Sequence, residues 1–315
     1  MINAFITYIE AEKRYSALTV RNYRHDLEIF AEWWCRKHDA KPSNFDVTQL
    51  REEDIRQWIM YRTGKKANGG KGISTQSMNR ELSTLRSFLC FLRKRGIVEK
   101  DLFKRISALK TARHLPTFIP ETRMWEVLDT LREESAEPSL LERRNALIVA
   151  LFYGSGIRLA ELHGARLCDL SEDYTTLRVR GKGDKERIIP LLPELSQRIE
   201  SYINALRDEG IVTTEQMPLI VTAKGTALAR SSIQQIVKSE LRRANITGKA
   251  SPHILRHTFA THLLNRNADM RDIQELMGHS SLKTTQHYTH NSIAQLQRVY
   301  NQAHPHGVQN QPKSN

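Results

Sequence analysis

The spacing of apolar residues constrains the fold of this chain more than any other feature. Tyr23, Leu27, Phe30 and Trp34 recur every three or four residues within positions 19–37, which is the period of a helix with one buried face. The same pattern begins at Phe5 and returns over residues 50–62 and 75–95. The pattern predicts an all-helical bundle that spans residues 1–112.

The segment 75–95 also carries many basic residues. Its apolar stripe is formed by Leu82, Leu85, Phe88, Leu89 and Leu92. Its basic side chains include Arg80, Arg86, Arg93 and Lys94, which are candidates for DNA contacts in a groove. The alternative for each of them is an ordinary solvated helix face. Just before this segment, residues 64–72 read GKKANGGKG, without the Lys-Ser/Thr ending of a nucleotide-binding P-loop.

The composition changes after the predicted bundle. Residues 113–120 contain Pro116 and Pro120 and follow a basic run, so they predict an extended linker. A second domain is expected over residues 121–303, with a frayed tail at 304–315. Its predicted helices cover residues 122–134, 140–153, 196–209 and 231–244. Gly154 and Gly156 are expected to end the second of them.

Two short strands are predicted inside the second domain. Thr176–Arg180 and Glu186–Pro190 are separated by GKGDK, a plausible hairpin turn. The expected fold class is therefore multidomain and mainly α. It combines an N-terminal helical bundle with a mostly helical second domain that holds a small antiparallel sheet.

Charge and composition narrow the classes of function. The 315 residues carry a formal net charge of +13, which indicates a polyanionic partner such as a nucleic acid. No apolar run is long enough to span a bilayer, and the N-terminus lacks a signal-peptide pattern. Cys35, Cys90 and Cys168 are far apart, which fits reduced thiols in the cytosol better than a disulfide framework.

Histidine and arginine concentrate between residues 251 and 290. Pro252 is suited to a helix start, and His253 and Arg256 lie three residues apart, on one helix face. Gly278 is a helix-ending glycine, so His279 is expected in the turn that follows, with Tyr288 farther along. A guanidinium binds phosphate oxygens, an imidazole donates or moves protons, and a tyrosine hydroxyl can act as a nucleophile.

This group of side chains would suit attack on a phosphodiester, although each one alone is more often structural. His257, His262, His287 and His290 are interpreted as hydrogen-bonded or solvent-facing residues without a catalytic role. No metal is expected. His253 and His257 have a spacing that zinc can use, but Arg256 beside them would repel a cation.

Three segments resemble the C-terminal signature of the tyrosine recombinases. They are HILRH from His253, LMGHS from Leu276 and TTQHYTH from Thr284, and the wording is most similar to the bacterial Xer group. GSGIRLAEL resembles the first box of the family, with Arg158 and Glu161 at its basic and acidic positions. Lys182 lies in the hairpin that resembles the lysine-bearing hairpin of the family.

The resemblance implies a catalytic set in the order of the family: Arg158, Lys182, His253, Arg256, His279 and Tyr288. The two arginines would hold phosphate oxygens, with the two histidines as further donors. Lys182 would protonate the departing 5′ oxygen, and Tyr288 would form a 3′-phosphotyrosine. Glu161 would support a catalytic side chain. No cofactor or ATP is implied, because the covalent bond conserves the phosphodiester energy.

The resemblance also implies partners and a location. The first domain would be a core-binding, SAM-like domain on double-stranded DNA. Two sites would be joined in a tetramer of one recombinase or of two paralogous Xer-type recombinases, with a septal DNA translocase as a further partner. The protein would work in the bacterial cytoplasm at the nucleoid. The predicted last helix, residues 292–300, would dock on a neighbouring protomer or on its own domain.

Three other functions stay open from the residues. The chain could be the integrase or invertase of a mobile element, a type IB topoisomerase, or a non-catalytic DNA-binding regulator. The chain begins close to the first bundle helix, which favours the simple Xer layout over an integrase with an extra arm-binding domain. The DNA sequence that is recognised, and the need for a second recombinase, do not follow from the residues.

Overall fold

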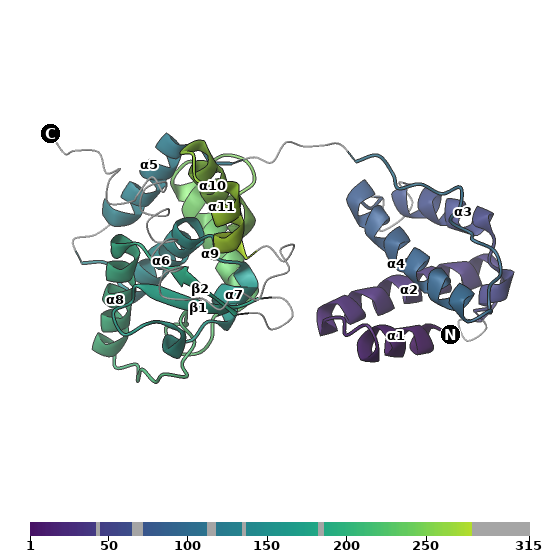
Figure 1. Ribbon diagram of the computed structural model, residues 1–315, viewed down its shortest axis with the longest axis horizontal. Helices are drawn as coiled ribbons and strands as arrows, with labels where there is room; N and C mark the ends of the chain where they lie inside the picture. The colour runs from purple at the N-terminus through teal and green to yellow at the C-terminus, as the bar shows by residue number, and fades with distance from the viewer. Residues whose placement is uncertain (42–44, 65–71, 112–117, 134–136, 182–185, 279–315) are drawn as a thin grey trace. The chain divides into compact units, whose positions relative to one another are not determined.

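The chain forms two compact units, Met1–Arg113 and His114–Asn315, in a computed structural model (Figure 1). The structure describes residues 1–41, 45–64, 72–111, 118–133, 137–181 and 186–278. None of the helices within these ranges is both long and apolar enough to cross a membrane.

The first unit is a helical bundle. Its α-helices are α1 (Ile2–Ala11), α2 (Ala17–Lys37), α3 (Glu52–Thr63) and α4 (Thr75–Lys94), and the short 3-10 helix η2 covers Val47–Gln49. Ser16 and Ser74 cap α2 and α4 by accepting a backbone N–H with their side-chain oxygens. The predicted stripe of α4 is buried, and Phe30, Trp58 and Phe88 fill the core.

Ion pairs to buried carboxylates connect the helices of this unit. Arg62 of α3 donates two hydrogen bonds to Glu81 of α4, at 2.5 and 3.0 Å, and the guanidinium lies over the ring of Trp58. Asp26 of α2 accepts from Arg80 and from the hydroxyl of Thr84. These contacts fix the position of α4 against α2 and α3.

The second unit surrounds one buried helix, α6 (Leu140–Ser155). Every residue of α6 from Ala146 to Ser155 is buried, and a helix that is covered on all sides lies at the centre of a domain. Around it pack α5 (Glu121–Glu133), α8 (Pro193–Asp208), α9 (Arg230–Arg243) and α10 (Pro252–Asn265) (Figure 1). The remaining helices are α7 (Leu159–Gly164), the 3-10 helix η3 (Leu167–Asp169) and α11 (Met270–Met277).

The two predicted strands form an antiparallel pair with the predicted bounds. β1 (Thr176–Arg180) pairs with β2 (Glu186–Pro190), with Thr176 opposite Pro190 and Arg180 opposite Glu186. Leu177 and Val179 of β1 face the core. The prediction of a mainly helical fold with a small antiparallel sheet is confirmed for the described residues.

Left-handed glycines end the two helices that border the site. α6 ends at Gly156, with φ +59°, and α11 ends at Gly278, with φ +63°. The prediction for Gly278 is confirmed, whereas the prediction that Gly154 also breaks the helix is wrong. Gly154 lies inside α6, because packing on all sides outweighs its low helix propensity.

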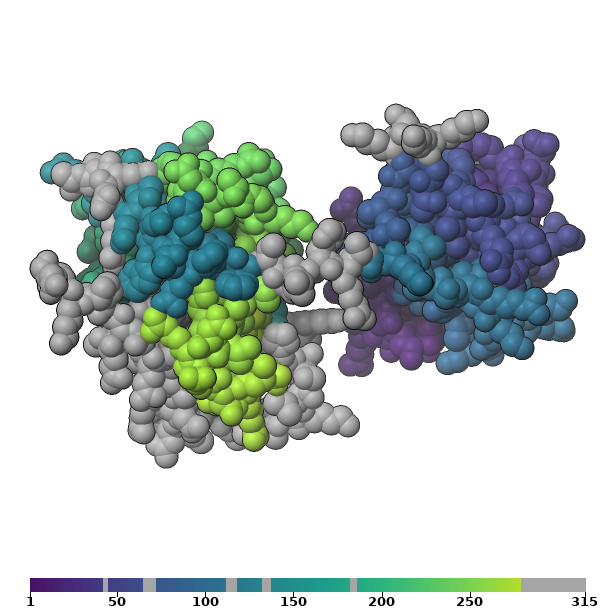
Figure 2. Space-filling model, turned by 90° about the horizontal axis from the view of Figure 1, so that it is seen from above, coloured from purple at the N-terminus to yellow at the C-terminus, as the bar shows by residue number. Residues whose placement is uncertain are grey.

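Ile119, in the described part of the predicted linker, is hydrogen-bonded to α10. The Ile119 backbone N–H donates to Thr258 Oγ1 at 3.0 Å, and the Ile119 carbonyl lies 2.9 Å from His262 Nε2. Arg266 forms an ion pair with Glu121. Thr258, His262 and Arg266 are four residues apart and share one face of α10. Figure 2 shows α10 and α11 in yellow-green beside the blue-teal surface of α5.

Candidate active site

The candidate site lies where four elements of the second unit meet. Arg158 is the N-cap of α7, Arg256 lies near the start of α10, and β2 contributes Arg187. All three guanidinium groups reach the C-terminal end of α11. A helix C-terminus leaves carbonyls without intrahelical partners and attracts cations, so it suits these arginines.

Arg256 is a buried cation held by two helix ends. Its residue surface is 7% exposed. Nη2 donates to the Met277 carbonyl at 2.5 Å, and Nη1 donates to the Gly156 carbonyl. Burial, followed by the charges of Arg158 and Arg187, lowers the pKa of Arg256 to about 9, so the group remains charged at neutral pH.

Arg158 is the more accessible of the two predicted arginines, with 35% of its side chain exposed. Its Nη1 donates to Glu161 Oε1 at 2.8 Å, and its Nη2 donates to the Gly278 carbonyl at 2.8 Å. The Arg158 backbone N–H also donates to Glu161 Oε2 at 2.8 Å. Glu161 therefore fixes both the backbone and the guanidinium of Arg158.

Glu161 is the common partner of two arginines. Its side chain is 1% exposed, and it accepts hydrogen bonds from Arg187 Nη1 at 2.6 Å and Nη2 at 3.0 Å. Burial alone would raise its pKa. The hydrogen bonds and charge of Arg187, followed by the bonds from Arg158, instead lower that pKa to about 2. The carboxylate is therefore ionised at neutral pH.

The sequence prediction missed Arg187. Its side chain is 6% exposed, and its Nε donates to the Leu276 carbonyl at 3.2 Å. The available signal was the two-residue period of a strand. Within Glu-Arg-Ile-Ile-Pro this period places Arg187 on the same inward face as Ile189. A charged residue at an inward strand position requires a buried partner.

The other predicted site residues divide into two groups. His253 is exposed in the first turn of α10, one turn before Arg256. Lys182, His279 and Tyr288 lie outside the described residues, although Gly278, directly before His279, is held by Arg158. His262, interpreted as structural, is buried and lies 3.1 Å from the Tyr153 hydroxyl.

Three of the four DNA-contact candidates on α4 have partners in the first unit. Arg80 pairs with Asp26, and Arg93 pairs with Asp101 at 2.9 Å. Arg86 donates to the Ile106 carbonyl at 2.9 Å, and its guanidinium lies 4.8 Å from the centre of the Phe103 ring. Lys94 is exposed at the C-terminal end of α4. All four keep exposed surface, so these contacts orient the basic face without burying it.

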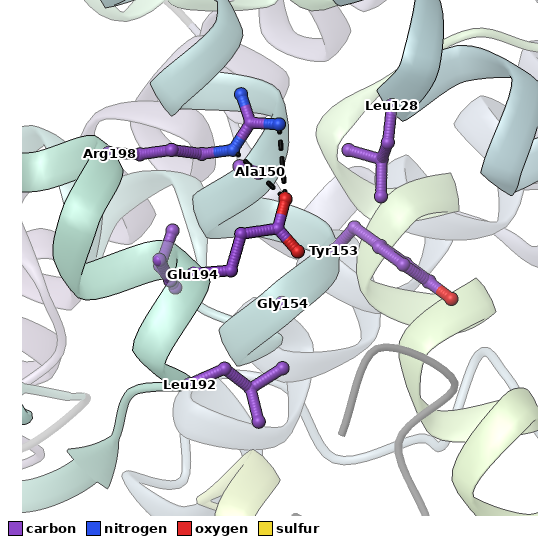
Figure 3. Close-up of a pocket in the computed structure, with 8 residues that line it drawn as sticks. Leu128, Ala150, Tyr153, Gly154, Leu192, Glu194 and Arg198 are labelled. Carbon is purple, nitrogen blue, oxygen red and sulfur yellow. Dashed lines mark hydrogen bonds and ion pairs between the residues drawn. The ribbon is translucent and has the colours of Figure 1, made fainter. Parts of the chain in front are cut away.

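Two hollows of the second unit differ in what they can hold. One measures about 20 Å³, room for about one water molecule, and lies between apolar side chains and the Glu194–Arg198 ion pair (Figure 3). The other measures about 630 Å³ beside α7 and β1, and Arg166, Arg178 and Arg180 line it with Glu161 and Asp169. The larger hollow has three arginines against two carboxylates, so it is basic and suited to an anionic partner.

Metal ligands do not gather in the part of the chain that the structure describes. Within those ranges, no group of three or more His, Cys, Asp or Glu side chains is placed to hold an ion.

Sequence comparison shows the family to which the chain belongs. Residues 121–295 match the phage integrase family, and residues 2–96 match the phage integrase N-terminal SAM-like domain. The chain belongs to the phage integrase family. A similar relative is tyrosine recombinase XerC of Oceanobacillus iheyensis, 35% identical over 96% of this chain and 95% of the relative. Tyrosine recombinase XerD of Lacticaseibacillus casei is 33% identical over 98% and 99%.

Solved structures share the fold. The XerH site-specific recombinase bound to a palindromic difH substrate has a TM-score of 0.68 and 19% identity, over 95% of this chain and 80% of that one. The Tn1549 transposon integrase in complex with circular intermediate DNA has a TM-score of 0.66 and 18% identity, over 93% and 97%. The predicted family, fold class and enzyme class, a tyrosine recombinase, are confirmed.

Proposed function

We propose that this recombinase cuts and rejoins duplex DNA at specific sites through a 3′-phosphotyrosyl bond to Tyr288, and that it resolves chromosome dimers. The observation that carries the proposal is the convergence of Arg158 and Arg256 on the end of α11, directly before His279. Both relatives named above are Xer recombinases, which favours chromosome-dimer resolution over the alternative of a mobile-element integrase.

The arginines would stabilise the transition state of phosphoryl transfer. Negative charge grows on the non-bridging oxygens as the phosphorus becomes five-coordinate, and fixed cations stabilise that charge without a metal ion. A guanidinium has five N–H donors, and the carbonyl contacts described for Arg256 use two of them. Of the two arginines, Arg158 offers the more exposed guanidinium.

The remaining side chains would move protons and form the covalent bond. His253 and His279 would donate to the same phosphate, and His253 would assist proton removal from Tyr288. A tyrosine hydroxyl has a pKa near ~10, so the neighbouring cations would help it ionise. Lys182 would protonate the departing 5′ oxygen. A 5′-hydroxyl from another strand would then reverse the step and complete the exchange.

The two units would divide the work of holding DNA. Residues 1–112 would serve as the core-binding domain, with Arg80, Arg86, Arg93 and Lys94 facing the duplex. Residues 113–120 would be the linker, 121–303 the catalytic domain and 304–315 a tail. Double-stranded DNA would lie along the hollow lined by Arg166, Arg178 and Arg180.

The assembly and location follow from the same proposal. Four recombinase chains, identical or of two paralogous Xer types, would join two DNA sites, with a septal DNA translocase as a further partner. The protein would act in the cytoplasm at the nucleoid, without a membrane anchor, metal ion or cofactor.

The test uses DNA recovered by the protein itself. Nicked fragments of the chromosome that encodes the chain are incubated with it, and the covalently attached fragments are sequenced. Strand exchange between two recovered sites is then measured for Tyr288→Phe and for the matched control Tyr300→Phe. We expect Tyr288→Phe to bind DNA and to lose exchange entirely, while Tyr300→Phe keeps it. The reverse result would assign the nucleophile to Tyr300, and exchange by both variants would contradict a tyrosine intermediate at either position.

A further inference from the structure

Arg187 is a buried charge that the proposed chemistry does not use. It lies on the inward face of β2 with 6% of its side chain exposed. A guanidinium in such a position is costly unless its donors are satisfied. Here Nε, Nη1 and Nη2 each donate a hydrogen bond, to the Leu276 carbonyl, Glu161 Oε1 and Glu161 Oε2.

These contacts leave the Arg187 guanidinium little surface for a contact with DNA. Each of its three nitrogens already donates to a protein oxygen, and the side chain is almost completely covered. Its influence on a phosphate must therefore pass through the groups that it holds. One of those groups is Glu161, which also binds the exposed guanidinium and the backbone of Arg158.

The other group is the end of α11. The carbonyls of Leu276, Met277 and Gly278 accept from three different arginines, Arg187, Arg256 and Arg158 respectively. The arginine on β2 is packed tightly there. A Cβ atom built on Gly278 would lie 2.9 to 3.1 Å from the guanidinium end of Arg187. The side chain of Arg187 thus packs directly against Gly278, the last residue before His279.

We propose that Arg187 is a positioning residue for strand cleavage. It orients Arg158 through Glu161, and it fixes the peptide that leads into His279. The proposal rests on the proposed function, because it assigns Arg187 to the same cleavage step.

The charge balance at Glu161 explains why the arrangement needs two arginines. With both present, one carboxylate is shared, and an excess of positive charge remains for a phosphate. Without Arg187, the ionised carboxylate would keep Arg158 as its only partner, and the orientation of Arg158 would depend on that single pair. The buried carboxylate would also lose the strongest of the contacts that favour its ionised form.

The first measurement compares cleavage with binding in the full chain. Arg187→Met removes the charge at similar length, and Arg187→Lys keeps the charge but loses the fork of donors. The rate of covalent adduct formation is measured in a single turnover on a nicked duplex of the recovered sequence. We expect a roughly 10- to 100-fold slower rate for Arg187→Met, as is usual when a residue that orients reacting groups is removed. Arg187→Lys should be intermediate, and the DNA affinity of both should match that of the unchanged chain.

The second measurement is the dependence of the adduct-formation rate on pH, which the loss of a purely structural residue would not change. In the unchanged chain the pKa of Glu161 is about 2, so its ionisation does not limit cleavage between pH 5 and 8. Loss of Arg187 raises that pKa, and the rate for Arg187→Met should fall as the pH is lowered. The double variant Glu161→Gln with Arg187→Met should lose this acid limb, because glutamine does not titrate.

Arg198→Met is the control, since it breaks a more exposed arginine–glutamate ion pair with Glu194, within α8. It should leave the adduct rate unchanged. Equal pH profiles for Arg187→Met and the unchanged chain would overturn the proposal. The proposal would also be overturned if both Arg187 variants lost DNA affinity by the same factor as the rate of adduct formation. That result would assign Arg187 to folding alone. If the unchanged chain forms no adduct, the proposed function fails first, which separates the two outcomes.

Discussion

Glu161 determines how the positive charges of the site are arranged. Among the described residues it is the only carboxylate that pairs with any of the three site arginines, and it accepts from both Arg158 and Arg187. The three-residue spacing of Arg158 and Glu161 allows their pairing at the start of α7, where Glu161 also accepts from the backbone N–H of Arg158. The pairing with Arg187 could not be predicted in this way, because it depends on how the β1–β2 hairpin packs against α7. Contacts within one helix turn can be predicted from the spacing of residues in the sequence, whereas contacts between elements cannot.

Replacement of Glu161 by glutamine should destabilise the fold. Glu161→Gln keeps the shape but leaves two arginines without their counter-charge, and breaking a buried pair costs about 3 kcal/mol or more. The folded pKa of about 2 lies below the ordinary value of ~4.3, so the carboxylate contributes stability that is complete above ~4.3. That contribution is lost as the pH falls towards about 2.

Urea unfolding of the full chain at several pH values measures this effect. The difference in unfolding free energy between the unchanged chain and Glu161→Gln should be constant from pH 5 to 8 and should shrink at lower pH. The matched control is Glu194→Gln, which removes the partly exposed partner of Arg198 and should cost under ~1 kcal/mol. An equal cost for the two variants would contradict a special role of Glu161.

Helix ends bring the site residues together at the scale of elements. The turn after α6 presents the Gly156 carbonyl to Arg256, and the end of α11 presents three carbonyls to three arginines. The sequence predicted the start of α10 at Pro252 and the end of α11 at Gly278, because proline and glycine are strong local signals. It placed the start of α8 at residue 196, whereas that helix begins at Pro193, with a proline in its first turn as in α10. It also could not predict that α6 continues through Gly154, because tertiary packing decides this.

Gly156 should be intolerant of a side chain. Its φ of +59° disfavours other residues, and an added Cβ would lie 2.5 and 2.7 Å from two ring atoms of Phe259. We expect Gly156→Ala to destabilise the protein by about 2–4 kcal/mol, the sum of left-handed strain and overpacking. Gly210→Ala is the control, because Gly210 has φ +71° with no heavy atom within 4 Å of the added Cβ. It should cost only about 1 kcal/mol in urea unfolding, and equal losses for both variants would contradict the packing argument.

Charge governs how the whole molecule meets its partner. A formal net charge of +13 and basic side chains in both units predict that several phosphates are neutralised together. The logarithm of DNA affinity should therefore fall with the logarithm of salt concentration, with a slope of about −0.9 for each phosphate. Fluorescence anisotropy on the recovered duplex over a range of KCl concentrations measures this slope. A slope near zero would contradict a binding mode based on phosphate contacts.

Removal of one positive charge from the basic hollow should reduce the dependence of DNA affinity on salt concentration. Arg178→Gln should lower its magnitude by about 0.9 if Arg178 neutralises one phosphate. Arg207→Gln is the control, because Arg207 is exposed near the end of α8 and does not line the hollow. An unchanged slope in Arg178→Gln would exclude this hollow as the DNA path.

The mainly helical fold with one antiparallel hairpin was predictable for the residues that the structure describes. Apolar periodicity predicted the helices, and the change of composition near residue 113 predicts a boundary between two domains. The family of the chain followed from motifs whose chemistry requires particular side chains at a fixed order. The buried network that orients those side chains was not predictable, since it is formed by contacts between segments far apart in the sequence.

The chemical structure of the covalent adduct tests directly whether Tyr288 is the nucleophile and whether cleavage proceeds without a metal ion. The full chain is incubated in EDTA with a nicked duplex of the recovered sequence, and the trapped adduct is digested and mapped by mass spectrometry. We predict nucleotides joined through a 3′-phosphate to the peptide that contains Tyr288, with a free 5′-hydroxyl on the departing strand, because Arg158 and Arg256 replace a metal ion as the phosphate clamp. An adduct on another residue, a bond to a 5′-phosphate, or cleavage only after addition of a divalent ion would contradict it.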